Sequence, residues 1–283
     1  MLRTKLMKFS ATLALVAMLA NVASPAVAFA GTVRLVGSTS LQPLAQLWAT
    51  AYHKAHPGTN VTVAGGGSGA GFTAAKNGSA ELGMSSKTQA DSDSAAQLTP
   101  VARDAVAVII NPNSNVKVLT IQQIQGIFTG QYKTWKQVGG KTHGKFNANH
   151  AIDLVGRTGA SGTYDYFKSV MLGGKSQSSK TKAYASNGMV RSAVGRDQYA
   201  IGYISLAYIN SSVRGIKIAP ATGKASVAPT QALARSGKYA YVRFLYFVNY
   251  AAHPRSAEAQ AFLDYCVSSS GQKLATSENL PLH

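Results

Sequence analysis

Apolar residues gather in three short segments in the first third of the chain, and each segment runs into a cluster of small or hydroxyl-bearing residues. This pattern predicts strands over Thr32–Val36, Asn60–Val63 and Glu81–Met84. The clusters that follow the strands are Gly37–Ser40, Gly65–Gly71 and Ser85–Lys87. In open α/β sheets, ligands bind at the carboxyl ends of the strands. Three such clusters therefore predict a site built from backbone amides and hydroxyl groups.

Helical spacing of apolar residues alternates with the strands. We expect a helix whose apolar positions run from Leu41 to Trp48, a second that begins after Thr120, and a last one over Ala257–Val267. Long, mostly apolar strands are predicted over Val101–Asn111 and Tyr239–Tyr250. The alternation of strands and helices along the chain predicts an α/β fold.

A fourth strand end has a more specific composition. An apolar run from Ile152 to Val155 leads into Arg157, three small residues and then Ser161-Gly162-Thr163. This order indicates a strand, a turn and the start of a helix, where unpaired backbone N–H groups attract anions. The two hydroxyl groups and the arginine would add donors. Two interpretations stay open for this segment alone: an anion site, or a helix cap beside a surface arginine.

Length and composition describe a globular protein. The 283 residues allow one large or two ordinary domains. With 46% hydrophobic and 13% charged residues, the chain is not of the disordered class. The formal net charge of +18 falls to +15 without the three basic residues that precede Ser10. Such a charge attracts anions and anionic surfaces, but it says nothing about the fold.

The N-terminus is predicted to be a secretory signal peptide, residues 1–30. Basic residues precede an apolar run from Ala11 to about Ala23, and an A-x-A end suggests cleavage after Ala28 or Ala30. We therefore expect a periplasmic or secreted protein. The single cysteine, Cys266, lies far from the cleavage site, so we expect neither a lipid-anchoring cysteine nor an internal disulfide.

The motifs of several enzyme classes are missing. The glycine run 65–71 lacks the lysine of a nucleotide P-loop, and no Gly-x-Ser-x-Gly elbow is present. The six histidines show no metal-ligand spacing, so no metal or cofactor is expected. Only Asp91 and Asp93 form a close acidic pair. Basic residues are scattered, apart from Tyr132–Lys136, which gives no basis for a nucleic-acid site.

Taken together, these segments resemble the phosphate-binding proteins of bacterial phosphate ABC importers, which have the class II periplasmic-binding-protein fold. The resemblance covers essentially the whole chain after the N-terminal segment. It is carried by Gly37–Pro43, Gly67–Gly69, Gly83–Ser86, Arg103–Val108, stretches of Leu119–Gly140, Arg157-x-x-x-Ser161-Gly162-Thr163, Gly202–Ser205 and Gly271-Gln272.

The resemblance implies a phosphate-binding site with three kinds of donor. Its first loop would be Thr39 and Ser40, the latter through its backbone N–H, and its second-loop hydroxyl would be Ser68. Arg157 would supply the cation, and we expect it to be the only side-chain cation that touches the ligand. The donors at the helix start would be Ser161, Gly162 and Thr163.

The chain departs from the family pattern at two acidic positions. Ser86 stands where many members carry an aspartate that accepts the phosphate proton, so Asp104 is our candidate for a substitute acceptor, with Asp165 as the second choice. The alternative is that Asp104 only pairs with Arg103 or Lys87. The acidic partner that usually holds the arginine is also missing, because Thr158 and Gly159 occupy that neighbourhood. A hydroxyl can donate or accept, so selectivity between phosphate and sulfate is open.

The resemblance further implies two α/β lobes joined by two crossing hinge strands. Lobe 1 would comprise residues 31–108 plus 239–283, and lobe 2 residues 109–238. The expected function is capture of inorganic phosphate between the lobes and delivery to a membrane permease, by a non-enzymatic monomer that binds no nucleic acid. Two alternatives stay open: the same fold binding another tetrahedral oxyanion such as sulfate or molybdate, and a secreted phosphatase-like enzyme.

Overall fold

A computed structural model describes residues 31–282. The predicted signal peptide lies outside the described residues, so its prediction stays untested. None of the described helices combines the length and apolarity that a membrane span requires.

The described elements alternate between strands and helices. The strands are β1 Gly31–Gly37, β2 Thr59–Gly66, β3 Leu82–Ser85, β4 Ala96–Ile110, β5 Val118–Thr120, β6 Asp153–Arg157, β7 Lys182–Tyr184, β8 Ala200–Ser205, β9 Arg214–Gly215, β10 Lys217–Ala219 and β11 Val242–Tyr250. The α-helices are α1 Gln42–Ala55, α2 Ser68–Lys76, α3 Ile121–Phe128, α4 Gly162–Tyr166, α5 Asn187–Arg196, α6 Gln231–Arg235, α7 Ala257–Val267 and α8 Ser269–Glu278. Short helices η1 Gln89–Asp91, η2 Trp135–Val138, η3 Phe167–Met171 and η4 Leu206–Tyr208 complete the fold.

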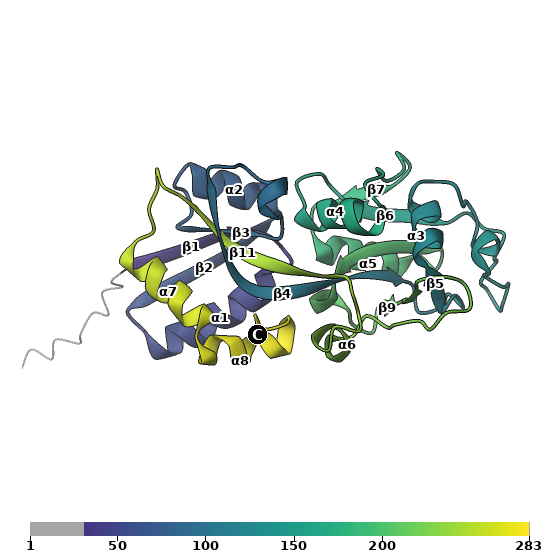
Figure 1. The fold of residues 1–283 in the computed structure, drawn as a ribbon. Helices are drawn as coiled ribbons and strands as arrows, with labels where there is room; N and C mark the ends of the chain where they lie inside the picture. The colour runs from purple at the N-terminus through teal and green to yellow at the C-terminus, as the bar shows by residue number, and fades with distance from the viewer. Residues whose placement is uncertain (1–30, 283) are drawn as a thin grey trace, which may run out of the picture.

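The elements form two halves that lie side by side (Figure 1). We use lobe 1 and lobe 2 for these halves, with the boundaries proposed above. In lobe 1, β1 pairs in parallel with both β2 and β3. Helices α1, α7 and α8 pack around a core that includes Leu35, Trp48 and Phe262. The indole of Trp48 donates to the carbonyl of Gly271 at 2.8 Å, which ties α1 to α8.

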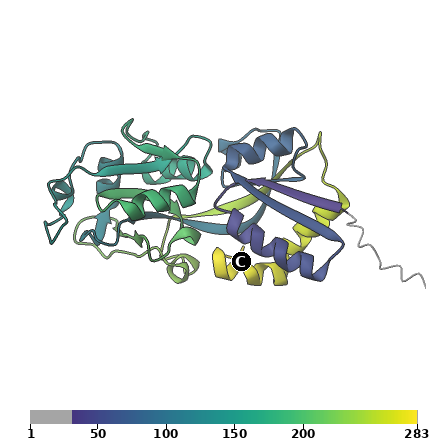
Figure 2. The same ribbon diagram turned by 180° about the vertical axis from the view of Figure 1, so that it is seen from behind.

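Lobe 2 has its own sheet and core. Strands β8, β6 and β7 are parallel, and β8 pairs antiparallel with the second part of β4. The core includes Phe128, Trp135, Phe167 and Tyr203, and among these Phe128 and Phe167 pack edge to face while Phe167 and Tyr203 are stacked. Seen from behind, the two lobes lie side by side, and β4 and β11 run between them (Figure 2).

The strands β4 and β11 connect the two lobes. From Ala96 to Ala105, β4 pairs antiparallel with β11, and from Val106 to Ile110 it pairs with β8 of lobe 2. The resulting sheet runs through both lobes in the order β2-β1-β3-β11-β4-β8-β6-β7. Residues of both strands at this crossing are therefore close to both lobes.

Most predicted elements are present, with shifted ends. Helix α2 begins at Ser68, within the glycine run 65–71, because Gly67 with φ +89° turns the chain directly into the helix. Strand β4 starts at Ala96 and not at Val101. Thr120 caps α3 as expected, since its hydroxyl accepts from the N–H of Gln123.

Candidate anion-binding site

The three strand ends of lobe 1 meet at the junction with lobe 2. Thr39 and Ser40 follow β1, Ser68 opens α2 after β2, and Ser86 follows β3, and all four are buried. Parallel strands end at the same edge of a sheet, which is why loops distant in sequence come together here.

The loops of lobe 1 are held by hydrogen bonds between serines. The Ser68 hydroxyl accepts from the Ser86 backbone N–H at 3.0 Å and lies 3.3 Å from the Ser86 hydroxyl. Ser38, which the sequence analysis did not select, donates to the Ser86 hydroxyl at 3.3 Å. Ser86 therefore sits within a hydroxyl cluster that can turn donors or acceptors toward a ligand.

Arg157 ends β6 and is almost fully buried, with 1% of its surface exposed. Its guanidinium donates to the side-chain oxygen of Asn187 at 2.9 Å and to the carbonyls of Ala185 at 2.8 Å and Tyr184 at 3.3 Å. These acceptors are neutral, so the positive charge is not compensated by a carboxylate. Burial lowers the pKa of Arg157 to about 10, which leaves it protonated at neutral pH.

The turn after β6 brings lobe 2 against lobe 1. The Ser161 hydroxyl caps α4 by accepting from the N–H groups of Thr163 and Tyr164. Gly162 faces the backbone of Ser86, where an added Cβ would lie 2.5 Å from the carbonyl carbon. Only glycine permits this close approach, which places the Ser161–Thr163 turn next to the third loop of lobe 1.

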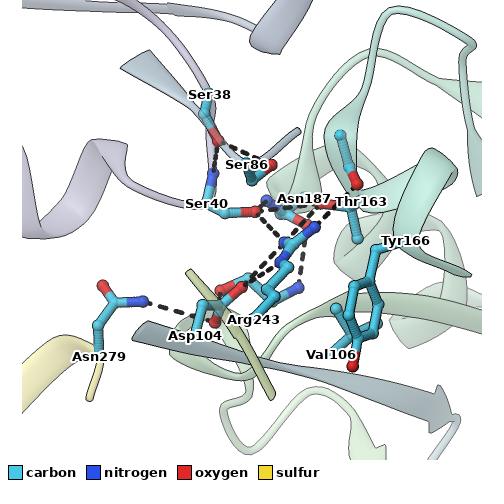
Figure 3. A network of polar contacts seen from close by, with 12 residues as sticks. Ser38, Ser40, Ser86, Asp104, Val106, Thr163, Tyr166, Asn187, Arg243 and Asn279 are labelled. Atoms are coloured by element: carbon cyan, nitrogen blue, oxygen red, sulfur yellow. Dashed lines mark hydrogen bonds and ion pairs between the residues drawn. The ribbon is translucent and has the colours of Figure 1, made fainter. Parts of the chain in front are cut away.

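A second buried arginine lies at the centre of the junction, and sequence reasoning missed it. The Arg243 Nη2 atom is 2.9 Å from three oxygens, those of the Ser40 hydroxyl, the Thr163 hydroxyl and the Asp104 carboxylate. Its Nη1 atom donates to the Gly162 carbonyl at 3.0 Å. Figure 3 shows the guanidinium between Ser40, Thr163 and Asp104. Arg243 comes from β11, so a hinge strand contributes directly to the site.

Asp104 is the counter-ion of Arg243. One oxygen accepts from Arg243, and the other accepts from the Ser205 hydroxyl at 2.7 Å and, more weakly, from Asn279 at 3.5 Å. Burial raises the pKa of the Asp104 carboxyl, while the guanidinium of Arg243 acts in the opposite direction. Lys87 pairs with Asp165 and the Arg103 guanidinium donates to the Pro281 carbonyl, so neither is an ion-pair partner of Asp104 in this structure.

Asn187 is a further residue that sequence reasoning missed. It is fully buried at the start of α5, where its side-chain nitrogen lies 3.0 Å from the Thr39 hydroxyl and 3.1 Å from the Ser40 hydroxyl. Its side-chain oxygen accepts from Arg157 and from the Ser205 N–H. Asn187 therefore links the cation of lobe 2 to the first loop of lobe 1.

Further contacts join the lobes around this cluster. The hydroxyls of Ser40 and Thr163 are 3.1 Å apart, and the Gly69 N–H donates to the Ala160 carbonyl at 2.9 Å. The ammonium of Lys87 in lobe 1 pairs with the carboxylate of Asp165 in lobe 2 at 2.7 Å. The lobes are thus in contact in this structure.

The structure brings the eight predicted ligand-binding residues together at one place between the lobes. They are Thr39, Ser40, Ser68, Ser86, Arg157, Ser161, Gly162 and Thr163. Around them lie Arg157 without a carboxylate partner, the Arg243–Asp104 pair and the Lys87–Asp165 pair, which together leave a local excess of one positive charge. Hydroxyl groups from both lobes surround that excess, an arrangement suited to a small oxyanion.

The fold and the junction define a two-lobe α/β protein whose lobes meet at a buried cluster of hydroxyl and guanidinium groups. Residues 23–270 match the family model described as PBP superfamily domain, and the chain belongs to this family. The resemblance found in the sequence and the two-lobe fold class with crossing hinge strands are thereby confirmed.

Individual relatives carry phosphate in their names. The chain is 30% identical to the phosphate-binding protein PstS of Pseudomonas aeruginosa over 272 residues, which cover 89% of this chain and 83% of that protein. A solved structure with bound phosphate from Clostridium perfringens, described as a putative phosphate ABC transporter substrate-binding protein, is 28% identical. It has a TM-score of 0.79 and covers 89% of this chain and 100% of that one. The structure of an ABC-type phosphate transport receptor from Vibrio cholerae is also 28% identical and has a TM-score of 0.66. It covers 89% of this chain and 100% of that one.

Proposed function

We propose that this protein captures inorganic phosphate between its lobes and delivers it to the membrane permease of an ABC importer. The observation that carries the proposal is the convergence of Arg157, Arg243 and hydroxyl groups of both lobes on one buried place. Because donors come from both lobes, bound phosphate stabilises the closed arrangement, which a permease can recognise.

The eight predicted residues supply the donors in this proposal. Thr39, Ser40, Ser68 and Ser86 bind from lobe 1, and the Ser161–Thr163 turn binds from lobe 2. Arg157 carries the net charge that attracts the ligand, since no carboxylate neutralises it. We add Arg243 as a second cation and assign Asp104 as its counter-ion. The competing assignment is that Asp104 accepts the proton of the bound phosphate.

We further propose that the protein is a non-enzymatic monomer, exported to the periplasm or secreted. Asp104 and Asp165, the acidic groups beside the site, are both occupied by cations, which favours binding over acid–base chemistry. Isothermal titration with phosphate, together with a phosphomonoester turnover assay, tests this interpretation. Heat of binding without turnover supports it, and turnover at an enzymatic rate would favour the phosphatase-like alternative.

Phosphate is expected to stabilise and compact the protein. At a phosphate concentration about 100 times the dissociation constant, the free energy of unfolding should rise by about 2.7 kcal/mol. Small-angle scattering should show a larger particle after exhaustive removal of phosphate, because the lobes separate about β4 and β11. The Arg157→Ala variant is the control and should respond less than the native protein at the same phosphate concentration, because its affinity is lower. Equal dimensions with and without ligand would contradict the hinged mechanism.

Sulfate is expected to compete with phosphate at this site. At neutral pH phosphate carries a proton and sulfate does not, and the Ser86 hydroxyl can serve either anion. Discrimination should therefore stay well below the roughly 10⁴–10⁵-fold that a dedicated hydrogen-bond acceptor gives. The Ser86→Asp variant should gain discrimination, since a carboxylate repels sulfate. Competition titrations measure this, and strong rejection of sulfate that is lost in Asp104→Asn would assign the acceptor role to Asp104.

A further inference from the structure

The positive charge of the protein lies almost entirely on one lobe. Residues 109–238 contain 17 lysines and arginines against three acidic residues, a net charge of +14. Residues 31–108 and 239–283 contain eight lysines and arginines against seven acidic residues, a net charge of +1. The two lobes form opposite ends of the molecule in Figures 1 and 2, so the charge is strongly polarised along its length. The proposed phosphate site uses one of these 17 side chains directly and leaves the rest unexplained.

Most cations of lobe 2 are exposed and lack an acidic partner. The four ion pairs found within residues 31–282 all take their cation from lobe 1, namely Arg34, Lys76, Lys87 and Arg243. One of the three acidic residues of lobe 2, Asp165, is occupied by Lys87. Thirteen cations of lobe 2 are exposed: Lys117, Lys133, Lys136, Lys141, Lys145, Lys175, Lys180, Lys182, Arg196, Lys217, Lys224, Arg235 and Lys238.

The character of this surface favours a broad anionic partner. Eleven of the thirteen exposed cations are lysines, which act as point charges and lack the bidentate geometry of arginine. They are spread over several loops and elements and are not confined to one groove. Nucleic-acid sites also use exposed aromatic rings for stacking, whereas Trp135, within the one segment where aromatics and lysines alternate, is fully buried.

We propose that lobe 2 is an electrostatic docking surface for a membrane rich in anionic lipid headgroups. The proposal rests on the proposed function, because the receiving permease lies in a membrane. A lobe with a net charge of +14 is attracted to the headgroups, while the nearly neutral lobe 1 is not. The protein would therefore accumulate at the membrane with lobe 2 toward the surface, which shortens its search for the permease. Salt must weaken this attraction, since the screening length is about 10 Å at 0.1 M.

Vesicle flotation tests the proposal on the purified protein. Vesicles of phosphatidylcholine with about a third of phosphatidylglycerol are compared with phosphatidylcholine alone, at low and at moderate salt. Each lysine near an anionic surface contributes about a fivefold gain in partitioning, which corresponds to ~1 kcal/mol. The triple variant Lys136→Glu, Lys141→Glu, Lys145→Glu should therefore partition at least about 100-fold less. These side chains are exposed and take part in none of the four ion pairs, so folding should not change.

A matched variant of lobe 1 separates local from total charge. Lys54→Glu and Lys273→Glu replace exposed lysines outside the four ion pairs and should reduce partitioning by less than about threefold. The lobe 2 double variant Lys136→Glu, Lys141→Glu changes the net charge equally and should lose at least about 25-fold. Phosphate affinity should be the same in the native protein and in all these variants, and a native protein that does not bind phosphate would refute the proposed function independently. Equal binding to both kinds of vesicle, equal losses in the two double variants, or binding to duplex DNA in the absence of vesicle binding would overturn the docking surface.

Discussion

Replacing Arg157 by alanine is expected to lower phosphate affinity by about 2–5 kcal/mol, which is roughly 30-fold to several thousandfold. Arg157 is 1% exposed and its guanidinium is held by neutral oxygens of Asn187, Ala185 and Tyr184. The charge of Arg157 is therefore available to the ligand. Without Arg157, the dianion would be bound by hydroxyl groups and by Arg243, whose charge is already balanced by Asp104. Isothermal titration measures the loss directly.

Two further variants make this result specific. Arg157→Lys keeps the charge but replaces the planar fork by a point charge, so most of the affinity should still be lost. Arg196→Ala removes an exposed cation of the same lobe and should leave affinity within about twofold, because solvent screens it. Native-like affinity of Arg157→Ala would remove the site assignment, and an equal loss in Arg196→Ala would point to long-range attraction.

The strand-end loops could be predicted from the sequence because their signals are local. Thr39, Ser68 and the Ser161–Thr163 turn each follow an apolar strand within a few residues, and parallel strands place such ends at one edge. The fold class followed from the same alternation of strands and helices. Such signals lie within a few consecutive residues, so they can be recognised without knowing how distant parts of the chain pack.

The hinge arginine could not be predicted in this way because its role depends on distant partners. Arg243 contacts Ser40, which is 203 positions away, and Asp104, which is 139 positions away. One weak signal was present: Arg243 shares the inward side of β11 with Leu245 and Phe247, whereas Phe244 faces outward. A cation at a core-facing position of an apolar strand needs a partner, and the sequence does not say which.

The two arginines differ in what compensates them, and this difference separates their roles. Arg157 has only neutral acceptors, so it supplies the net charge of the site. Arg243 is balanced by Asp104 and reaches hydroxyls of both lobes, so it positions Ser40 and Thr163 while offering one more donor. A site with one net positive charge and many hydroxyls binds an anion without burying several opposed charges, which would be costly to desolvate.

Breaking the Arg243–Asp104 pair from either side is expected to destabilise the protein by about 3–5 kcal/mol. Arg243 and Asp104 are almost fully buried, with 6% and 1% of their surfaces exposed. When one of them is replaced, water cannot solvate the charge of the other. Arg243→Met leaves the Asp104 carboxylate unpaired, and Asp104→Ala leaves the guanidinium unpaired. Urea unfolding in phosphate-free buffer measures both losses.

The double variant Arg243→Met, Asp104→Asn separates folding from binding. It removes both charges, and the amide oxygen introduced in place of the carboxylate could still accept from the Ser205 hydroxyl, so most of the lost stability should return. Phosphate affinity should stay lower by about 1.5–3 kcal/mol, because a charged donor between Ser40 and Thr163 is gone. If the double variant binds phosphate as tightly as the native protein, Arg243 only holds the hinge together and does not contact the ligand. If its stability does not return, the pair orders the junction in a way that neutral side chains cannot replace.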